Sequence, residues 1–195
     1  MKFVFKVDGE TRFQCKLKSH RCVETNNKGQ RCRKNSVIGI PVCWIHLLSK
    51  KHLRIKNTTS IPQPKGKGLF ALDRKKGEND VIFKKGETIF AYEGEYIDKA
   101  TLNERYGDFT APYAVMVKKN RYIDSACERG VASLINHANN KKNVNAKFTV
   151  TRGKDRKASG IKVVAIKDIN NDKEIFLDYG RDYQFDEDNV LFKTS

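Results

Sequence analysis

The sequence lacks any long hydrophobic run, since none of its apolar stretches approaches the roughly 20 residues that a helix needs to cross a bilayer. Residues 1–7 are only partly apolar and are interrupted by lysines, so they do not resemble a secretory signal. Internal repeats and low-complexity tracts are absent, as is the alternation of strands and long helices that a parallel α/β sheet requires. These absences predict an intracellular protein without a membrane span.

Acidic residues are scarce at the N-terminal end of the chain. Residues 1–56 hold 14 Lys and Arg against 3 Asp and Glu, a net charge of +11, whereas the whole chain carries +16. Such a concentrated positive charge favours binding to nucleic acid or to an acidic protein surface. The alternative is a solvated basic surface that only keeps the protein soluble. A hydrophobic fraction of 38% is enough for one ordinary domain and a small additional module.

Short alternating segments separated by glycine and charged turns predict a mostly β fold. Residues 2–7 and 11–15 alternate on either side of Asp8-Gly9, a pair that tolerates the positive φ angles of a type I′ turn. They therefore predict a β-hairpin. Further strands are expected at residues 68–72, 88–92, 113–117, 122–123, 147–150, 161–165 and 175–178. Helical turns are expected only at residues 99–106 and 131–135.

Four of the five cysteines lie between residues 15 and 43, and such clustering in an intracellular protein favours a metal site over disulfides. Cys22, Cys32, Cys43 and His46 offer three thiolates and one imidazole, which suits tetrahedral zinc. Because this segment has few apolar residues, it needs a metal to hold a fold. We therefore expect one structural zinc. The alternative is free cysteines in a disordered arm.

The remaining Cys and His residues have other expected roles. Cys15 and His20 are spare, and either could replace one of the four ligands. His52 follows the cluster in a basic run and is expected to be solvated. Cys127 has no Cys or His near it in the sequence, so core packing is its expected role. Residues 56–65 are rich in Asn, Thr, Ser and Pro and predict a linker or an irregular strand.

Three motifs follow one another in the rest of the chain. They are PKGKGLFA at residues 64–71, SLINHANN at 133–140 and EIFLDYG at 174–180. Together and in this order they resemble the SET-domain protein lysine methyltransferases, and the resemblance spans about residues 60–185. The cysteine pattern is similar to small zinc modules of large DNA virus proteins, and the short tail is similar to that of stand-alone viral SET proteins.

The resemblance implies a β-clip fold of several small curved sheets. In this fold the segments of Asn136 and Tyr179 come together at a knot-like crossing. The chain would then consist of a basic hairpin and zinc module at residues 1–56, and a SET methyltransferase domain with a short C-terminal tail at residues 57–195.

The same resemblance implies S-adenosylmethionine as the methyl donor. In the family the backbone of an Asn-His pair contacts the adenine, and the Asn side chain reaches the amino-acid end of the cofactor. A glycine-containing turn lets main-chain atoms approach the methionine part. The residues of this chain that match the pair and the turn are Asn136, His137, Lys65, Gly66, Lys67 and Gly68.

Tyrosines are the expected catalytic residues. Tyr179 matches the catalytic tyrosine, which also borders the cofactor, and Tyr113 matches a tyrosine shared between the cofactor site and the lysine channel. Tyr183 lies where some members place a second channel tyrosine. No cysteine follows Tyr179, so residues 183–192 are expected to close the channel in place of a zinc-binding tail. Leu177, where a tyrosine would limit methylation, predicts products beyond monomethyl-lysine.

The expected function is methylation of lysines in basic protein tails, with histone tails as the leading substrate. The basic N-terminal module would then contact nucleosomal DNA or acidic protein, in the nucleus or in a viral replication compartment of the host, and a homodimer is a further expectation. Two alternatives remain open. One is a non-catalytic SET-like protein that binds chromatin or nucleic acid, and the other is a methyltransferase for a non-histone protein.

Overall fold

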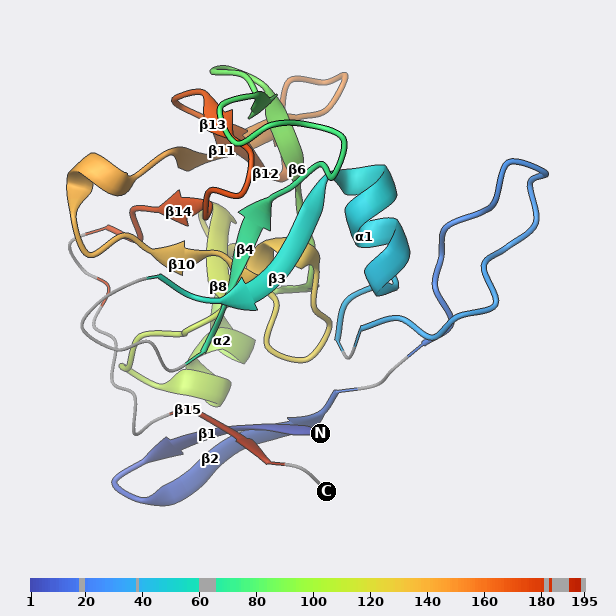
Figure 1. Cartoon of the computed structure of the whole chain (residues 1–195). Coiled ribbons are helices and arrows are strands. Elements are labelled where there is room, and N and C mark those ends of the chain that lie inside the picture. The colour runs from blue at the N-terminus through green and yellow to red at the C-terminus, as the bar shows by residue number, and fades with distance from the viewer. Residues whose placement is uncertain (18–19, 38, 60–65, 181–182, 184–189, 194–195) are drawn as a thin grey trace.

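The computed structural model describes residues 1–17, 20–37, 39–59, 66–180, 183 and 190–193 (Figure 1). The strands are β1 (Lys2–Val7), β2 (Glu10–Lys16), β3 (Leu53–Asn57), β4 (Lys67–Ala71), β5 (Val81–Phe83), β6 (Thr88–Tyr92), β7 (Glu95–Ile97), β8 (Ala114–Lys118), β9 (Arg121–Asp124), β10 (Asn136–His137), β11 (Ala146–Arg152), β12 (Ala158–Ala165), β13 (Ile169–Asn170), β14 (Phe176–Leu177) and β15 (Val190–Lys193). The helices are α1 (Trp44–Lys51) and α2 (Lys99–Tyr106), with 3₁₀ turns at Val131–Leu134 and Lys141–Asn143.

The strands form several small sheets, which confirms the predicted fold class. Their orders are β15-β1-β2, β11-β12-β6, β7-β9-β8, β3-β4, β13-β5 and β10-β14. Only the β10-β14 pair is parallel among the strands that the structure describes. Figure 1 shows α1 beside β3, and the β15-β1-β2 sheet below the main body, next to α2.

The N-terminal hairpin forms as the sequence predicts. Asp8 and Gly9 take φ angles of 51° and 83°, as a type I′ turn requires, and β1 pairs with β2 in antiparallel register. Phe3 and Phe5 of β1 are fully buried. The ring of Phe5 meets that of Tyr106 at 5.1 Å between centroids, so the hairpin is fastened to α2 by aromatic packing.

Helix α1 and strand β3 are not predicted, and the expectation that helical turns occur only at 99–106 and 131–135 is wrong. α1 starts after Cys43 and buries Leu47. The positive charges of Lys50 and Lys51 in its last turn interact favourably with the negative end of the helix dipole. β3 occupies the start of the expected linker and pairs with β4. The rest of that linker, residues 60–65, lies outside the described residues.

The cysteine-rich segment and the rest of the chain share one hydrophobic core. Cys22, Cys43 and Leu47 are buried in the same cluster as Leu53 and Leu69. The expected boundary between residues 56 and 57 falls inside β3, and the division of the chain into 1–56 and 57–195 stays a prediction.

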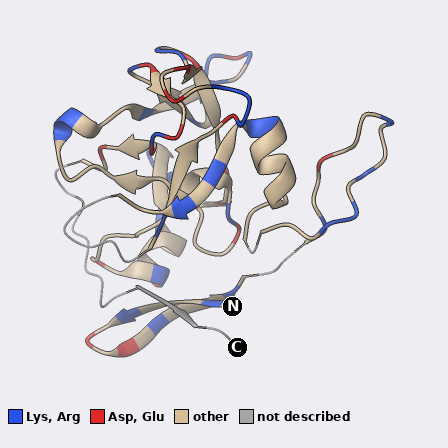
Figure 2. Cartoon of the chain, in the orientation of Figure 1, with Lys and Arg blue, Asp and Glu red and all other residues tan. Residues whose placement is uncertain are grey.

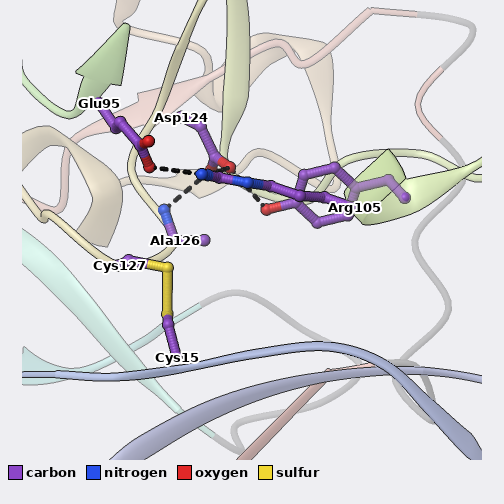
Figure 3. The surroundings of a disulfide bond; sticks show 7 residues. Cys15, Glu95, Arg105, Asp124, Ala126 and Cys127 are labelled. Atoms are coloured by element: carbon purple, nitrogen blue, oxygen red, sulfur yellow. Dashed lines mark hydrogen bonds and ion pairs between the residues drawn. A yellow bond between two sulfur atoms is a disulfide. The ribbon is translucent and has the colours of Figure 1, made fainter. Parts of the chain in front are cut away.

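A disulfide joins Cys15 of β2 to Cys127 in the loop after β9 (Figure 3). Cys15 is therefore no substitute metal ligand, and the expectation that Cys127 serves only to pack the core is also wrong. The bond lies beside a partly buried ion cluster, in which Arg105 donates to Asp124 at 2.9 Å and to Glu95 at 2.7 Å. Sequence pattern could not pair two cysteines that are 112 residues apart.

Neither described helix is long and apolar enough to cross a membrane. Lys and Arg lie on the hairpin, on the projecting loop of residues 20–36 and at the end of α1 (Figure 2). In the tail expected to close the channel, Tyr183 is described, residues 184–189 lie outside the described residues, and β15 pairs with β1.

Candidate active site and metal centre

Parallel pairing of β10 with β14 brings together two motifs that lie about forty residues apart. Asn136 stands opposite Phe176 and His137 opposite Leu177. Beyond the strands, the backbone N–H of Tyr179 donates to Nδ1 of His137 at 3.1 Å. This bond makes Nδ1 an acceptor and fixes the imidazole against the backbone of residues 174–180.

Tyr179 is partly buried and packs against the main hydrophobic core. Its hydroxyl donates to the carbonyl of Ile135, and its ring lies 4.6 Å from that of Tyr183 and 5.4 Å from that of His137, measured between centroids. Burial raises the pKa of the Tyr179 phenol well above its ordinary value. The residue is thus a neutral donor held in one orientation.

Tyr113 and Tyr183 stand on the other wall of the site. The Tyr183 hydroxyl approaches the Pro112 carbonyl at 3.4 Å, and burial raises the pKa of Tyr183. The Tyr113 ring contacts the ring of Phe3, with 5.7 Å between centroids, and the guanidinium of Arg129, 4.3 Å from the ring centroid. Two side chains therefore hold Tyr113 in place.

A cavity of about 230 Å³ lies between these tyrosines. Aromatic and aliphatic side chains dominate its lining, which consists of Tyr92, Pro112, Tyr113, Ala114, Val115, Met116, Ala132, Ser133, Ile135, Phe148, Leu177, Tyr179 and Tyr183. All three tyrosines expected from sequence, Tyr113, Tyr179 and Tyr183, meet in this one cavity.

Tyr92 and Phe148 are lining residues that sequence reasoning missed. The Tyr92 hydroxyl donates to the Tyr113 carbonyl at 2.7 Å, and burial raises the pKa of Tyr92. The Phe148 ring meets the Tyr92 ring edge-on at 5.2 Å between centroids. Both residues sit in predicted strands but in no motif, so the only signal was an aromatic residue at a buried strand position.

The glycine turn lies beside Asn136. Its first predicted residue, Lys65, is outside the described residues, while Gly66 has a φ of 140°, which favours glycine. The Lys67 carbonyl accepts a bond from Nδ2 of Asn136 at 3.1 Å, and Lys67 Nζ donates to Asn57. Gly68 is packed so closely that a Cβ would lie 1.9 Å from Oε1 of Glu174.

The predicted metal ligands Cys22, Cys32, Cys43 and His46 come together, with their ligand atoms all within 4.8 Å of one another. Nδ1 of His46 lies 3.4 Å from the Sγ atoms of both Cys22 and Cys43. A zinc ion with bonds of about 2.3 Å to sulfur and 2.0 Å to nitrogen would separate such atoms by about 3.5 Å in a tetrahedron.

The surroundings of the cluster suit thiolate ligands. The backbone N–H of Cys43 donates to Cys22 Sγ at 3.3 Å, and that of Lys34 donates to Cys32 Sγ at 3.4 Å, so two sulfurs accept hydrogen bonds from peptide N–H groups. Arg21 and Arg31 brace the loop by donating to its carbonyls. The four residues therefore fit a zinc ion.

Comparison with known proteins agrees with this geometry. The family model described as the SET domain matches residues 66–180. No curated protein sequence matches the chain. Among solved structures, ctPRC2 in an autoinhibited conformation bound to S-adenosylmethionine is 24% identical, covers 66% of this chain and has a TM-score of 0.50.

Two further structures of the Chaetomium thermophilum polycomb repressive complex 2 are similar. The complex bound to GSK126 is 25% identical over 66% of this chain, with a TM-score of 0.50. ctPRC2 in complex with H3K27me3 and a second histone H3 form is 21% identical over 82%, with a TM-score of 0.52. These matches span 15%, 16% and 17% of the respective chains, so this chain corresponds to a small part of each. The match to the SET-domain model covers more than half of the sequence, and the chain belongs to the SET-domain family.

Proposed function

We propose that this chain transfers methyl groups from S-adenosylmethionine to lysine side chains of proteins. The observation that carries the proposal is the cavity lined by Tyr92, Tyr113, Tyr179 and Tyr183, directly beside the crossing of β10 and β14. A lysine side chain is a flexible apolar stem with one nitrogen at its tip, and a narrow aromatic cavity accommodates that shape.

The cavity addresses the main obstacle to the reaction, which is the charge of the lysine. With a pKa near 10.4, removing the lysine proton at pH ~7.4 costs about 4 kcal/mol. Loss of water in this enclosed, largely apolar lining disfavours the ammonium form and lowers this cost. Tyr179 stays protonated because its pKa is raised by burial, so it orients the amine through hydrogen bonding and ring contact and takes no proton from it.

Residues around Asn136 fit the methyl donor. When bound, S-adenosylmethionine supplies an electrophilic methyl group on a sulfonium sulfur. The backbone of β10 would contact its adenine, and the tight approach of Gly68 to Asn136 would border its amino-acid end. Holding both reactants in line accounts for much of the rate by proximity.

For the substrate we propose histone tails. Support comes from the basic N-terminal residues, whose charge suits nucleosomal DNA, and from the similar ctPRC2 structure in complex with H3K27me3. This proposal includes a nuclear or viral-replication-compartment location and a homodimer. A structural zinc at Cys22, Cys32, Cys43 and His46 completes the proposal.

The test is transfer of labelled methyl from S-adenosylmethionine to recombinant nucleosomes and free histones. Native chain is compared with Tyr179→Phe, which removes the buried hydroxyl, and with the matched control Tyr96→Phe, which alters an exposed tyrosine outside the cavity. Label on a histone lysine that falls about 100-fold in Tyr179→Phe alone is the expected result.

The other outcomes separate the alternatives. Cofactor binding without label on any histone would direct the substrate search to non-histone proteins. Absence of both cofactor binding and transfer would overturn the enzymatic proposal and leave a SET-fold binding protein.

A further inference from the structure

Glu174 begins the third motif, residues 174–180, and its carboxylate has a complete set of hydrogen-bond donors. The side chain is buried, with 5% of its surface exposed. Oε1 accepts from the Thr58 hydroxyl at 2.7 Å and from Asn136 Nδ2 at 3.0 Å. Oε2 accepts from both the backbone N–H and the hydroxyl of Thr59, each at 2.6 Å. Four donors fill the four strong acceptor positions of a carboxylate.

These bonds fix the direction of the Asn136 amide. Its nitrogen has two hydrogens, and two acceptors meet them, the Lys67 carbonyl at 3.1 Å and Oε1 of Glu174 at 3.0 Å. A flipped amide would place its oxygen against both acceptors, with no hydrogen between them. Oδ1 of Asn136 must therefore point away from Glu174.

Gly68 shows that the glycine turn is shaped by the same carboxylate. A Cβ on Gly68 would lie 1.9 Å from Oε1 and 2.7 Å from Cδ of Glu174, and 3.0 Å from Nδ2 of Asn136. The missing side chain at this position makes room for Glu174 itself. The turn, the carboxylate and the amide are thus packed as one unit.

The carboxylate of Glu174 is stabilised by hydrogen bonds from neutral groups. Among the residues that the structure describes, no Lys, Arg or His lies within ion-pair distance of this carboxylate. A buried negative charge attracts a cation nearby more strongly than an exposed one does. The Asn136 Oδ1 atom and the negative charge of Glu174 together favour a cationic group next to Oδ1 of Asn136.

We propose that Glu174 is a positioning residue that holds the Asn136 amide with Oδ1 toward the cationic amino-acid end of the methyl donor. The inference rests on the proposed function, because it assumes that Asn136 faces that donor. It assigns to Glu174 a role in recognising the ammonium of the amino-acid part, and none in recognising the nucleoside part.

Calorimetry with two ligands tests this division. S-adenosylhomocysteine carries the amino-acid end, whereas 5′-methylthioadenosine has the same nucleoside without it. In Glu174→Gln one acceptor oxygen becomes an NH₂ group, which opposes a donor and removes the charge. We expect S-adenosylhomocysteine to bind at least about tenfold more weakly, and 5′-methylthioadenosine to bind as it does to the native chain.

Glu104→Gln, on the exposed side of α2, is the matched control and should change neither affinity. Thr59→Val removes one donor to Oε2 without touching Asn136, and a smaller loss for S-adenosylhomocysteine alone is expected. This second variant keeps the test available if Glu174→Gln does not fold.

Equal weakening of both ligands, or no weakening of either, in a folded Glu174→Gln or Thr59→Val chain would overturn the inference while leaving the proposed function intact. Failure of the native chain to bind S-adenosylhomocysteine would instead overturn the proposed function. In steady-state assays the positioning role predicts a raised KM for the methyl donor with an unchanged KM for the protein substrate.

Discussion

Tyr179 joins three parts of the site through separate atoms. Its backbone N–H donates to His137, its hydroxyl donates to the Ile135 carbonyl, and its ring packs on Tyr183. Because the hydroxyl donates to a carbonyl and burial raises its pKa well above the ordinary value, it is protonated at neutral pH. The residue therefore contributes shape and dipole to the site, with no change of charge.

This protonation state predicts the pH dependence of methyl transfer. The substrate lysine must lose a proton, so the rate should rise by about tenfold per pH unit between pH 7 and 9. The pKa of Tyr179 is raised well above 10 by burial, so its ionisation gives no descending limb in this range. Initial rates at saturating cofactor measure the profile. A maximum below pH 8 in folded protein would contradict it.

Leu177 lies in the cavity lining and is 1% exposed. Replacing it with tyrosine adds volume and a hydroxyl to a cavity of about 230 Å³, so Leu177→Tyr should shift the product toward monomethyl-lysine. Mass spectrometry of a substrate peptide reads the methyl count. Leu177→Met, which conserves volume, is the control and should keep the native distribution. Strictly monomethyl product from the native chain would refute the idea.

At residue scale, the motifs predicted the tyrosines beside the paired strands β10 and β14. They did not predict the other aromatic residues that line the cavity. Tyr113, Tyr179 and Tyr183 meet in one cavity as the resemblance implied. Tyr92 and Phe148 escaped notice because their roles depend on which strands become neighbours. The pairing of β12 with β6 and β11 sets that neighbourhood, and no local pattern encodes it.

At the scale of elements, local signals predicted local structure well. The β1-β2 hairpin follows from alternation and from the Asp8-Gly9 turn. α2 forms at the residues expected to be helical, and the structure adds its cap, the Asp98 carboxylate, which accepts the Thr101 N–H. α1 was missed because Cys43 offers no side-chain cap and the segment was interpreted through its ligands. β3 was missed because polar residues dominate it and its stability comes from β4.

The Cys15–Cys127 disulfide links the hairpin to the loop after β9. Closing a loop of this length restricts the unfolded chain, so Cys127→Ser should lower the unfolding free energy by about 2–5 kcal/mol. Urea denaturation measures the loss. Reductant should reduce native stability to the level of the variant and leave the variant unchanged. An equal effect of reductant on both chains would contradict the prediction.

Loss of a ligand from the metal cluster should also lower the stability of the protein. Cys43 is a ligand and is also buried in the core shared with Leu53 and Leu69, so zinc release should unfold more than the loop. Cys43→Ser should lose most of the zinc and more than about 3 kcal/mol of stability in a single transition. Elemental analysis and thermal unfolding measure both. His20→Ala, outside the cluster, should behave as native. Retention of zinc by Cys43→Ser would contradict the ligand set.

At the scale of the whole molecule, buried phenols predict how stability depends on alkaline pH. Burial raises the pKa of Tyr92, Tyr106, Tyr179 and Tyr183 above the unfolded value near 10. Stability should therefore be constant below about pH 10 and fall above it, by about 1.4 kcal/mol per pH unit for each group, because the unfolded chain ionises first.

Urea denaturation followed by circular dichroism between pH 8 and 11 measures this slope. Tyr106→Phe should lower stability at all pH values. Because it removes one buried phenol, it should also make the fall of stability above pH 10 shallower by the contribution of that one group. A slope that is the same in native and Tyr106→Phe chains would show that these phenols do not govern alkaline unfolding.

The position of β1 between β2 and β15 has a consequence for synthesis of the chain (Figure 1). β1 pairs on one side with β2, which follows it directly in the chain, but on its other side Lys2 stands opposite Lys193. During synthesis this second edge of β1 therefore stays open until β15 has been made, and in that interval it is exposed to other nascent chains. The sheet is complete only after residue 193 has emerged from the ribosome.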